Sequence, residues 1–113
     1  MECLFCKIIS GEIPAKKLYE DEDCVIISDI DPQAPTHALV LPREHIRSLD
    51  EADAAHEELL GKLLLNAANF ARREGFAENG YRVVINTNEN GGQTVFHLHV
   101  HVLAGRPFVF PPG

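Results

Sequence analysis

Three histidines alternate with aliphatic residues near the C-terminus of the chain. Residues 97–102 read His-Leu-His-Val-His-Val. A period of two, in a sequence rich in valine and leucine, predicts a half-buried β-strand, so His97, His99 and His101 should project from one face at intervals of about 6.6 Å. Imidazoles have an unperturbed pKa of about 6.5, which suits nucleophilic and acid–base chemistry at neutral pH.

A turn rich in glycine and asparagine precedes this predicted strand. Residues 88–94 read Asn-Glu-Asn-Gly-Gly-Gln-Thr, and glycine and asparagine accept positive φ angles. Successive backbone N–H groups in such a turn can converge on an anion. A histidine strand beside an anion-binding turn therefore predicts chemistry on a phosphate.

Two further segments accompany the triad and the turn. Residues 29–37 read Asp-Ile-Asp-Pro-Gln-Ala-Pro-Thr-His, and residues 111–113 read Pro-Pro-Gly. Together with Gly-Gly-Gln-Thr-Val-Phe at 91–96 and the triad at 97–103, they closely resemble the histidine triad (HIT) family, in particular its Hint branch of nucleoside phosphoramidate hydrolases. The resemblance covers almost the whole chain. It implies a five-stranded antiparallel sheet with one long and one short helix, continued into ten strands across a homodimer.

The remaining sequence predicts the elements that position these residues. A short helix is expected over 3–10, ended by Gly11, and strands are expected at 17–20, 24–29, 38–41 and 81–86. The last of these should pair antiparallel with the histidine strand. Antiparallel strands with helices packed on one face make an α+β fold, and 113 residues fit one domain over 1–113.

One long helix is expected in the middle of the chain, capped by Ser48 or Asp50 and stopped by Gly75. Acidic residues crowd its first half, and Arg72 and Arg73 lie at its end, as the helix dipole favours. Its buried stripe is predicted to consist of the apolar residues at helical spacing: Leu59, Leu60, Leu63, Leu64, Ala67, Phe70 and Ala71.

Composition and charge exclude several classes of function. The net charge is −7 and no Lys/Arg cluster is present, which argues against binding nucleic acid. No apolar run reaches the length of about 18 residues that crosses a bilayer, and the N-terminus lacks a signal segment, so we expect a cytoplasmic protein without a membrane partner. The three cysteines are therefore not expected to form disulfides, and Cys24 should behave as a small buried hydrophobic residue.

The resemblance assigns roles to four histidines. It implies that His99 is the nucleophile and becomes transiently nucleotidylated, while its second ring nitrogen bonds to a nearby backbone carbonyl. His101 would donate to the phosphate oxygens or to the leaving group. His97 and His37 would complete an orienting network. The alternative for the triad is a solvated histidine face on an edge strand.

The resemblance also implies a nucleotide site. The Thr94 hydroxyl would help to protonate the departing amine, and Asp29 would accept hydrogen bonds from the ribose. Phe110 stands where the Hint branch commonly has tryptophan, on a tail that reaches toward the partner's active site. The implied nucleotide-binding residues are Asp29, Ile30, Asn86, Gly92, Gln93, Thr94, Val95, His99 and His101.

Cys3 and Cys6 form a Cys-x-x-Cys pair near the N-terminus. With His45 and His97 they could build a tetrahedral structural zinc site, an arrangement that some HIT proteins carry. The alternative is that the two cysteines pack as small apolar residues on one face of the short helix. His56 lies outside both constellations and is expected to be a solvated helix residue.

The function expected from the resemblance is that of a homodimeric hydrolase that binds a purine nucleoside monophosphate. It would cleave a P–N bond at the α-phosphate through a nucleotidyl-histidine, with no metal in the chemical step. Three alternatives stay open. They are a dinucleoside polyphosphate hydrolase of the Fhit type, a nucleotide sensor or scaffold with vestigial catalysis, and a metallohydrolase that uses a His-x-His pair as ligands.

Overall fold

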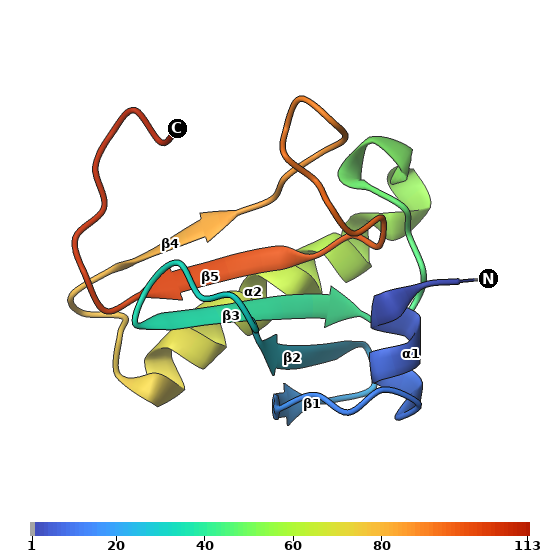
Figure 1. The fold of residues 1–113 in the computed structure, drawn as a ribbon, viewed down its shortest axis with the longest axis horizontal. Helices are drawn as coiled ribbons and strands as arrows, with labels where there is room; N and C mark the ends of the chain where they lie inside the picture. The colour runs from blue at the N-terminus through green and yellow to red at the C-terminus, as the bar shows by residue number, and fades with distance from the viewer. Residues whose placement is uncertain (1) are drawn as a thin grey trace.

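The structure is a computed structural model that describes residues 2–113. Five strands form one antiparallel sheet in the order β1-β2-β3-β5-β4, accompanied by a short and a long helix (Figure 1). This confirms the predicted α+β class, strand number and helices. The elements are α1 Leu4–Ser10, β1 Lys17–Glu20, β2 Cys24–Ser28, β3 Thr36–Pro42, α2 Glu57–Glu74, β4 Tyr81–Val84 and β5 Val100–Ala104.

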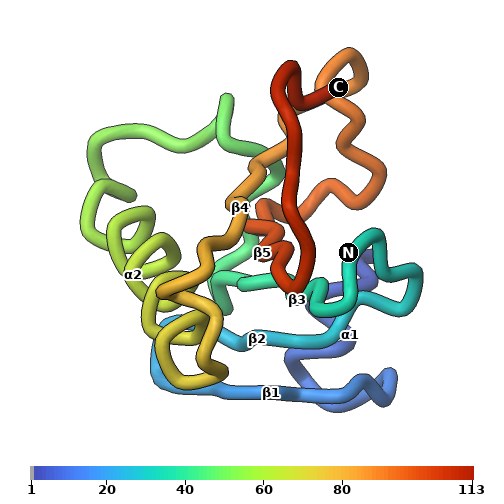
Figure 2. Tube along the Cα trace, turned by 90° about the vertical axis from the view of Figure 1, so that its left-hand side faces the viewer, coloured from blue at the N-terminus to red at the C-terminus, as the bar shows by residue number. Residues whose placement is uncertain are grey.

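The two helices lie on opposite faces of the sheet, as Figure 2 shows, so the prediction that both pack on one face was wrong. Successive side chains of a strand point to opposite faces. In β2, Ile26 packs in the core with Leu63 of α2, whereas Ile27 packs with Phe5 of α1. The short apolar helix α1 thus packs on the face of the sheet opposite to α2.

The histidine segment keeps its predicted alternation, although β5 begins only at Val100. Leu98, Val100 and Val102 join the core against α2, while the histidines lie on the α1 face. The hydrogen bonds between β5 and its neighbours begin only at Val100 because the chain bends before this residue. The N–H of Leu98 donates instead to the main-chain oxygen of Ile46 over 2.7 Å. The register with β3 places His101 opposite Leu39.

The long helix begins at Glu57, so the predicted caps Ser48 and Asp50 were wrong. Ala52 is extended and interrupts the helical path, which leaves two short 3₁₀ turns, Leu49–Glu51 and Ala54–His56, before α2. Seven residues were predicted to form the stripe of α2, and Leu64 is the one that is exposed. No helix within residues 2–113 is long and apolar enough to span a bilayer.

Candidate functional site

His99 lies immediately before β5 with its ring almost fully buried. Its Nδ1 is 2.8 Å from the main-chain oxygen of His97. A carbonyl oxygen only accepts hydrogen bonds, so Nδ1 carries the proton and Nε2 keeps a free electron pair. Burial lowers the pKa of His99, which keeps the ring neutral at pH 7. An unprotonated imidazole nitrogen is what a nucleophilic histidine requires.

A chain of hydrogen bonds fixes the other ring on this face, His101. The peptide N–H of Gln33 donates to Nδ1 of His37 over 3.0 Å. His37 must therefore carry its proton on Nε2, which lies 2.8 Å from Nδ1 of His101. His101 accepts at Nδ1 and carries its own proton on Nε2. Because the Gln33 amide occupies Nδ1 of His37, His37 orients His101 without relaying protons to it.

The Nε2 atom of His101 lies 3.5 Å from Nδ2 of the Asn86 side chain, and because both atoms carry hydrogen this contact leaves the Nε2–H of His101 without an acceptor and available to a ligand. Burial, followed by the neighbouring rings of His99 and His37, lowers the pKa of His101 to about 4. The ring is therefore an uncharged donor at neutral pH. An uncharged donor can bind a phosphate oxygen without adding a competing positive charge next to His99.

We expect these assignments to be visible in two-bond ¹⁵N–¹H spectra of the imidazoles. At pH 7 they should show His99 protonated on Nδ1 and His101 on Nε2, with His101 staying neutral until the pH approaches 4. The pKa of His101 is lower in the folded protein than in the unfolded chain. The free energy of unfolding of the protein should therefore decrease as the pH falls from about 6.5 to about 4. Gln33→Pro removes the N–H donor and should mix the His101 tautomers, whereas Gln33→Ala should not. A wild-type His101 protonated on Nδ1 at pH 7 would contradict the assignment.

A cavity of about 260 Å³ opens beside the two rings, and we call it the His99 cavity. Asp29 and Ile30, predicted to bind a nucleoside, both line it with His99 and His101. Asp29 is held in place because its Oδ1 accepts from the N–H of Asp31 at 2.8 Å. The apolar wall of this cavity was not predicted, although the apolar residues of α1 could have indicated it. That wall includes Phe5, Ile8, Ile13 and Leu39.

The glycine-rich loop, whose backbone N–H groups were predicted to bind phosphate, is organised by the buried side chain of Gln93. Its Oε1 accepts from the N–H of Asn88, and its Nε2 donates to the main-chain oxygens of Arg47 and Val95. The backbone N–H groups of Gly92 and Gln93 also donate within the loop, to Glu89 and Asn88. The N–H groups of Gly92 and Gln93 are therefore used within the loop. The predicted phosphate donors that remain are the N–H groups of Thr94 and Val95.

The four predicted metal ligands come together beside the triad. The donor atoms of Cys3, Cys6, His45 and His97 all lie within 4.8 Å of one another. Nδ1 of His97 is 3.4 Å and 3.6 Å from the two sulfurs and 3.1 Å from Nδ1 of His45. Ligand–ligand distances of about 3.3–3.8 Å follow from tetrahedral zinc with bonds of about 2.0–2.3 Å. Nε2 of His97 donates to the main-chain oxygen of Pro42, which leaves Nδ1 free to bind a metal.

Two predicted residues lie elsewhere. His56 ends the second 3₁₀ turn, where it pairs with Glu44 at 3.0 Å and completes a capping box with Asp53, so it is partly buried rather than fully solvated. Phe110 is 85% exposed on the C-terminal tail. Among residues 2–113, those that line the His99 cavity do not include Phe110.

A comparison with known protein families decides the affiliation of the chain, because the HIT domain matches residues 10–108. The chain belongs to the HIT family. Purine nucleoside phosphoramidase of Escherichia coli K12 is 47% identical to this HIT protein over 106 residues, which cover 94% of this chain and 89% of that protein. An uncharacterized HIT-like protein of Synechococcus elongatus is 53% identical over 112 residues, 99% of this chain and 97% of that protein.

Solved structures of other HIT proteins share this fold. A HIT family hydrolase from Legionella pneumophila superposes with a TM-score of 0.97 at 47% identity, covering 99% of this chain and all of that one. A zinc-bound histidine triad family protein from Mycobacterium smegmatis has a TM-score of 0.78 at 35% identity, covering 94% of this chain and 76% of that one. These relatives support a hydrolase of the HIT family.

Proposed function

We propose that this HIT protein hydrolyses purine nucleoside phosphoramidates through a covalent nucleotidyl-His99 intermediate. One observation carries the proposal: His97 fixes the proton of His99 on Nδ1 and leaves Nε2 unprotonated beside a cavity that also holds Asp29. The purine nucleoside phosphoramidase name of the Escherichia coli relative supports the substrate class.

The reaction proceeds by two displacements at the α-phosphorus. In the first, Nε2 of His99 forms a bond to phosphorus while the P–N bond to the amine breaks. The electron pair of that bond stays on the amine nitrogen, which takes a proton with help from the Thr94 hydroxyl. In the second, a water oxygen bonds to phosphorus and gives up a proton, which replaces the one taken by the amine. The electron pair of the P–Nε2 bond returns to His99 as this bond breaks, and the nucleoside monophosphate leaves.

The other residues bind and orient the substrate in this proposal. The N–H groups of Thr94 and Val95 and the side chain of Asn86 hold the phosphate, with Nε2–H of His101 as an uncharged donor. Asp29 accepts hydrogen bonds from the ribose. Ile30 is 98% exposed, so the base would cover it while the apolar wall of α1 borders the nucleoside. Together these contacts account for each predicted nucleotide-binding residue outside the loop scaffold of Gly92 and Gln93.

Steady-state kinetics on matched substrates tests this function. We expect turnover of adenosine 5′-phosphoramidates with a much higher kcat/KM than for diadenosine polyphosphates, which are the substrates of a Fhit-type enzyme. Retention of activity in a chelator, with the fold intact, would remove the metallohydrolase alternative. Tight AMP binding without turnover of any conjugate would instead favour a nucleotide sensor.

We also propose that Cys3, Cys6, His45 and His97 hold a structural zinc ion. The donor atoms fit a tetrahedral set without an open position, which is typical of structural rather than catalytic zinc. When bound, zinc supplies a crosslink between α1 and the segment that carries the triad. His97 then connects both sites, because its main-chain oxygen accepts from His99 while its ring faces the cysteines.

We propose in addition that two copies pair through β4 and the adjoining face of α2. β4 is an edge of the sheet, and an unpaired edge is a template for a further strand. An apolar pocket of about 220 Å³ lies beside it, lined by residues that include Leu60, Leu64 and Ile85. Leu65 of α2 and Val83 of β4 are also exposed apolar residues, and a second copy of the chain would cover them.

Leu64→Glu is therefore expected to dissociate the dimer, because it places a charge in the apolar contact. Sedimentation should show the wild type at twice the 12.5 kDa chain mass and the variant at the chain mass. Leu18→Glu is the matched control, since Leu18 is an exposed leucine on the opposite edge strand. A wild type that sediments as a 12.5 kDa species at micromolar concentration would overturn the dimer.

A further inference from the structure

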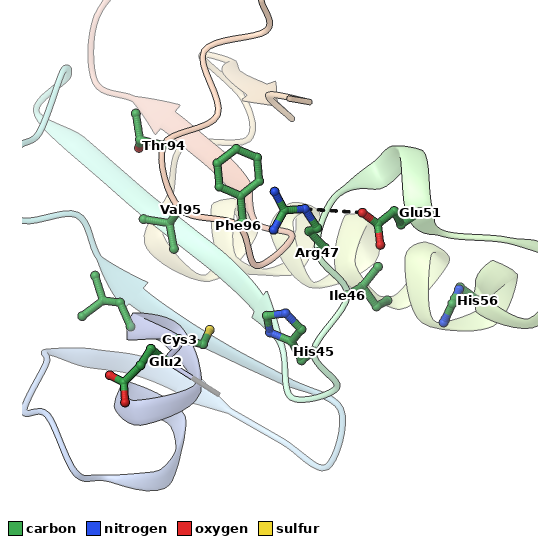
Figure 3. A pocket seen from close by; sticks show the side chains of 11 residues that line it. Glu2, Cys3, His45, Ile46, Arg47, Glu51, His56, Thr94, Val95 and Phe96 are labelled. Carbon is green, nitrogen blue, oxygen red and sulfur yellow. Dashed lines mark ion pairs between the residues drawn. The ribbon is translucent and has the colours of Figure 1, made fainter. Parts of the chain in front are cut away.

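A second, larger cavity adjoins the His99 cavity, and Leu4 and Val95 line both of them. We call it the Arg47 cavity. It has a volume of about 730 Å³, and its walls include Thr94, Phe96, Arg47, Glu51 and His45 (Figure 3). This volume lies within the range of about 300–1,000 Å³ that is usual for small-molecule sites.

The position of Thr94 connects this cavity to the proposed reaction. In an in-line displacement the leaving amine departs from the side of phosphorus opposite the attacking Nε2 of His99. The proposed function places the Thr94 hydroxyl at that amine, and Thr94 lines the Arg47 cavity. The substituent carried by the amine would therefore extend past Thr94 into this cavity.

The side chain of Arg47 is 55% exposed, and two contacts orient its guanidinium group at the cavity. Its Cζ atom lies 4.3 Å from the centroid of the Phe96 ring, and its Nε is 3.5 Å from a carboxylate oxygen of Glu51, as Figure 3 shows. Within residues 2–113, neither Nη group has a hydrogen-bond partner. A stacked guanidinium with its paired N–H groups unoccupied has the geometry that binds a carboxylate through two hydrogen bonds.

The acidic groups of the cavity are already engaged by cations. Glu2 pairs with Lys7 at 2.7 Å, and Glu51 pairs with Arg47. His56 is held by Glu44. Arg47 is the one arginine or lysine among the lining residues, and its unused donors suit an anionic rather than a cationic ligand.

We propose that the Arg47 cavity binds the leaving amine of the substrate and that Arg47 recognises a carboxylate carried on that amine. This inference rests on the proposed phosphoramidate hydrolysis and deepens it. Arg47 thus distinguishes nucleoside phosphoramidates by whether their amine carries a carboxylate. Arg47 determines specificity and takes no part in the displacement at phosphorus.

Matched conjugates test the proposal. AMP is joined through a P–N bond to ω-amino acids of increasing length and, separately, to their uncharged amides. For the length that spans from Thr94 to Arg47, kcat/KM should favour the carboxylate by about tenfold or more, as for a hydrogen-bonded charge pair. In Arg47→Gln this preference should fall to about one while turnover of the amide is unchanged. Arg72→Gln, which alters an exposed arginine at the far end of α2, should leave the preference intact.

Binding to a His99→Ala variant separates this inference from the proposed function, because it needs no turnover. Calorimetry should show the same preference for the carboxylate conjugate and its loss in His99→Ala/Arg47→Gln. Equal affinity for both conjugates would overturn the role of Arg47, even if wild-type turnover is fast. A preference for a diamine conjugate would overturn it in favour of Glu51 and Glu2. Discrimination in binding without any wild-type turnover would overturn the hydrolase and retain the site.

Discussion

His99→Ala is expected to lower phosphoramidate turnover by about 10⁴-fold or more, because it removes the only nitrogen placed to attack phosphorus in the proposed reaction. The affinity for AMP should change little, since Asn86 and the backbone N–H groups of Thr94 and Val95 hold the phosphate. Stopped-flow or steady-state assays with an adenosine 5′-phosphoramidate measure the first quantity, and calorimetry measures the second.

The intermediate gives an independent check on this prediction. Mass spectrometry of quenched wild-type reactions should locate a nucleotidyl adduct on His99. His56→Ala is the matched control, because His56 pairs with Glu44 and lies outside the His99 cavity. Undiminished turnover in His99→Ala, or an adduct on another histidine, would disprove the proposed mechanism.

Replacing both Cys3 and Cys6 with serine should abolish zinc binding and lower the melting temperature by roughly 10–15 °C, as expected for a loss of about 3 kcal/mol in a domain of this size. Two thiolates that connect α1 to His97 are lost, so the second face of the sheet is held only by apolar contacts. Activity at 25 °C should remain largely intact, because the hydrogen bond from His99 to His97 is made by the main chain.

Elemental analysis provides the direct measurement for this variant. Wild-type protein purified without added metal should contain about one zinc per chain, and the double variant none. Cys24→Ala is the control, because Cys24 is fully buried against the α2 side of the sheet and should not affect the metal content. A well-folded wild type that lacks zinc and has freely titratable Cys3 and Cys6 thiols would return both residues to a packing role.

The fold was largely predictable because its signals are local. Alternation in residues 97–102 placed the histidines and the aliphatic residues on opposite faces, and Gly11 and Gly75 end their helices in the left-handed conformation as expected. The errors arose where contacts between distant parts of the chain determine the structure. The extended Ala52 delays α2, and the face covered by α1 depends on packing that no local period encodes.

The candidate site was predictable in its residue types and only in part in its hydrogen bonds. The resemblance implied a bond from His99 to a nearby backbone carbonyl, but it gave neither the residue that supplies this carbonyl nor the proton positions on His37 and His101. That assignment depends on main-chain groups, the oxygen of His97 and the amide of Gln33, whose positions follow only from the folded backbone. The role of the Gln93 side chain in holding the loop was not predicted, because one of its partners, the main-chain oxygen of Arg47, is distant in the sequence.

The hydrogen bond from the Gln33 amide to His37 has a consequence for engineering this protein. The contact is made by the peptide group, so nineteen of the twenty residue types at position 33 supply the same donor. Sequence variation there would leave the His101 tautomer unchanged, with proline as the single exception. A library that randomises position 33 can therefore vary this exposed side chain freely, while the proton positions on the histidine rings are set by the backbone.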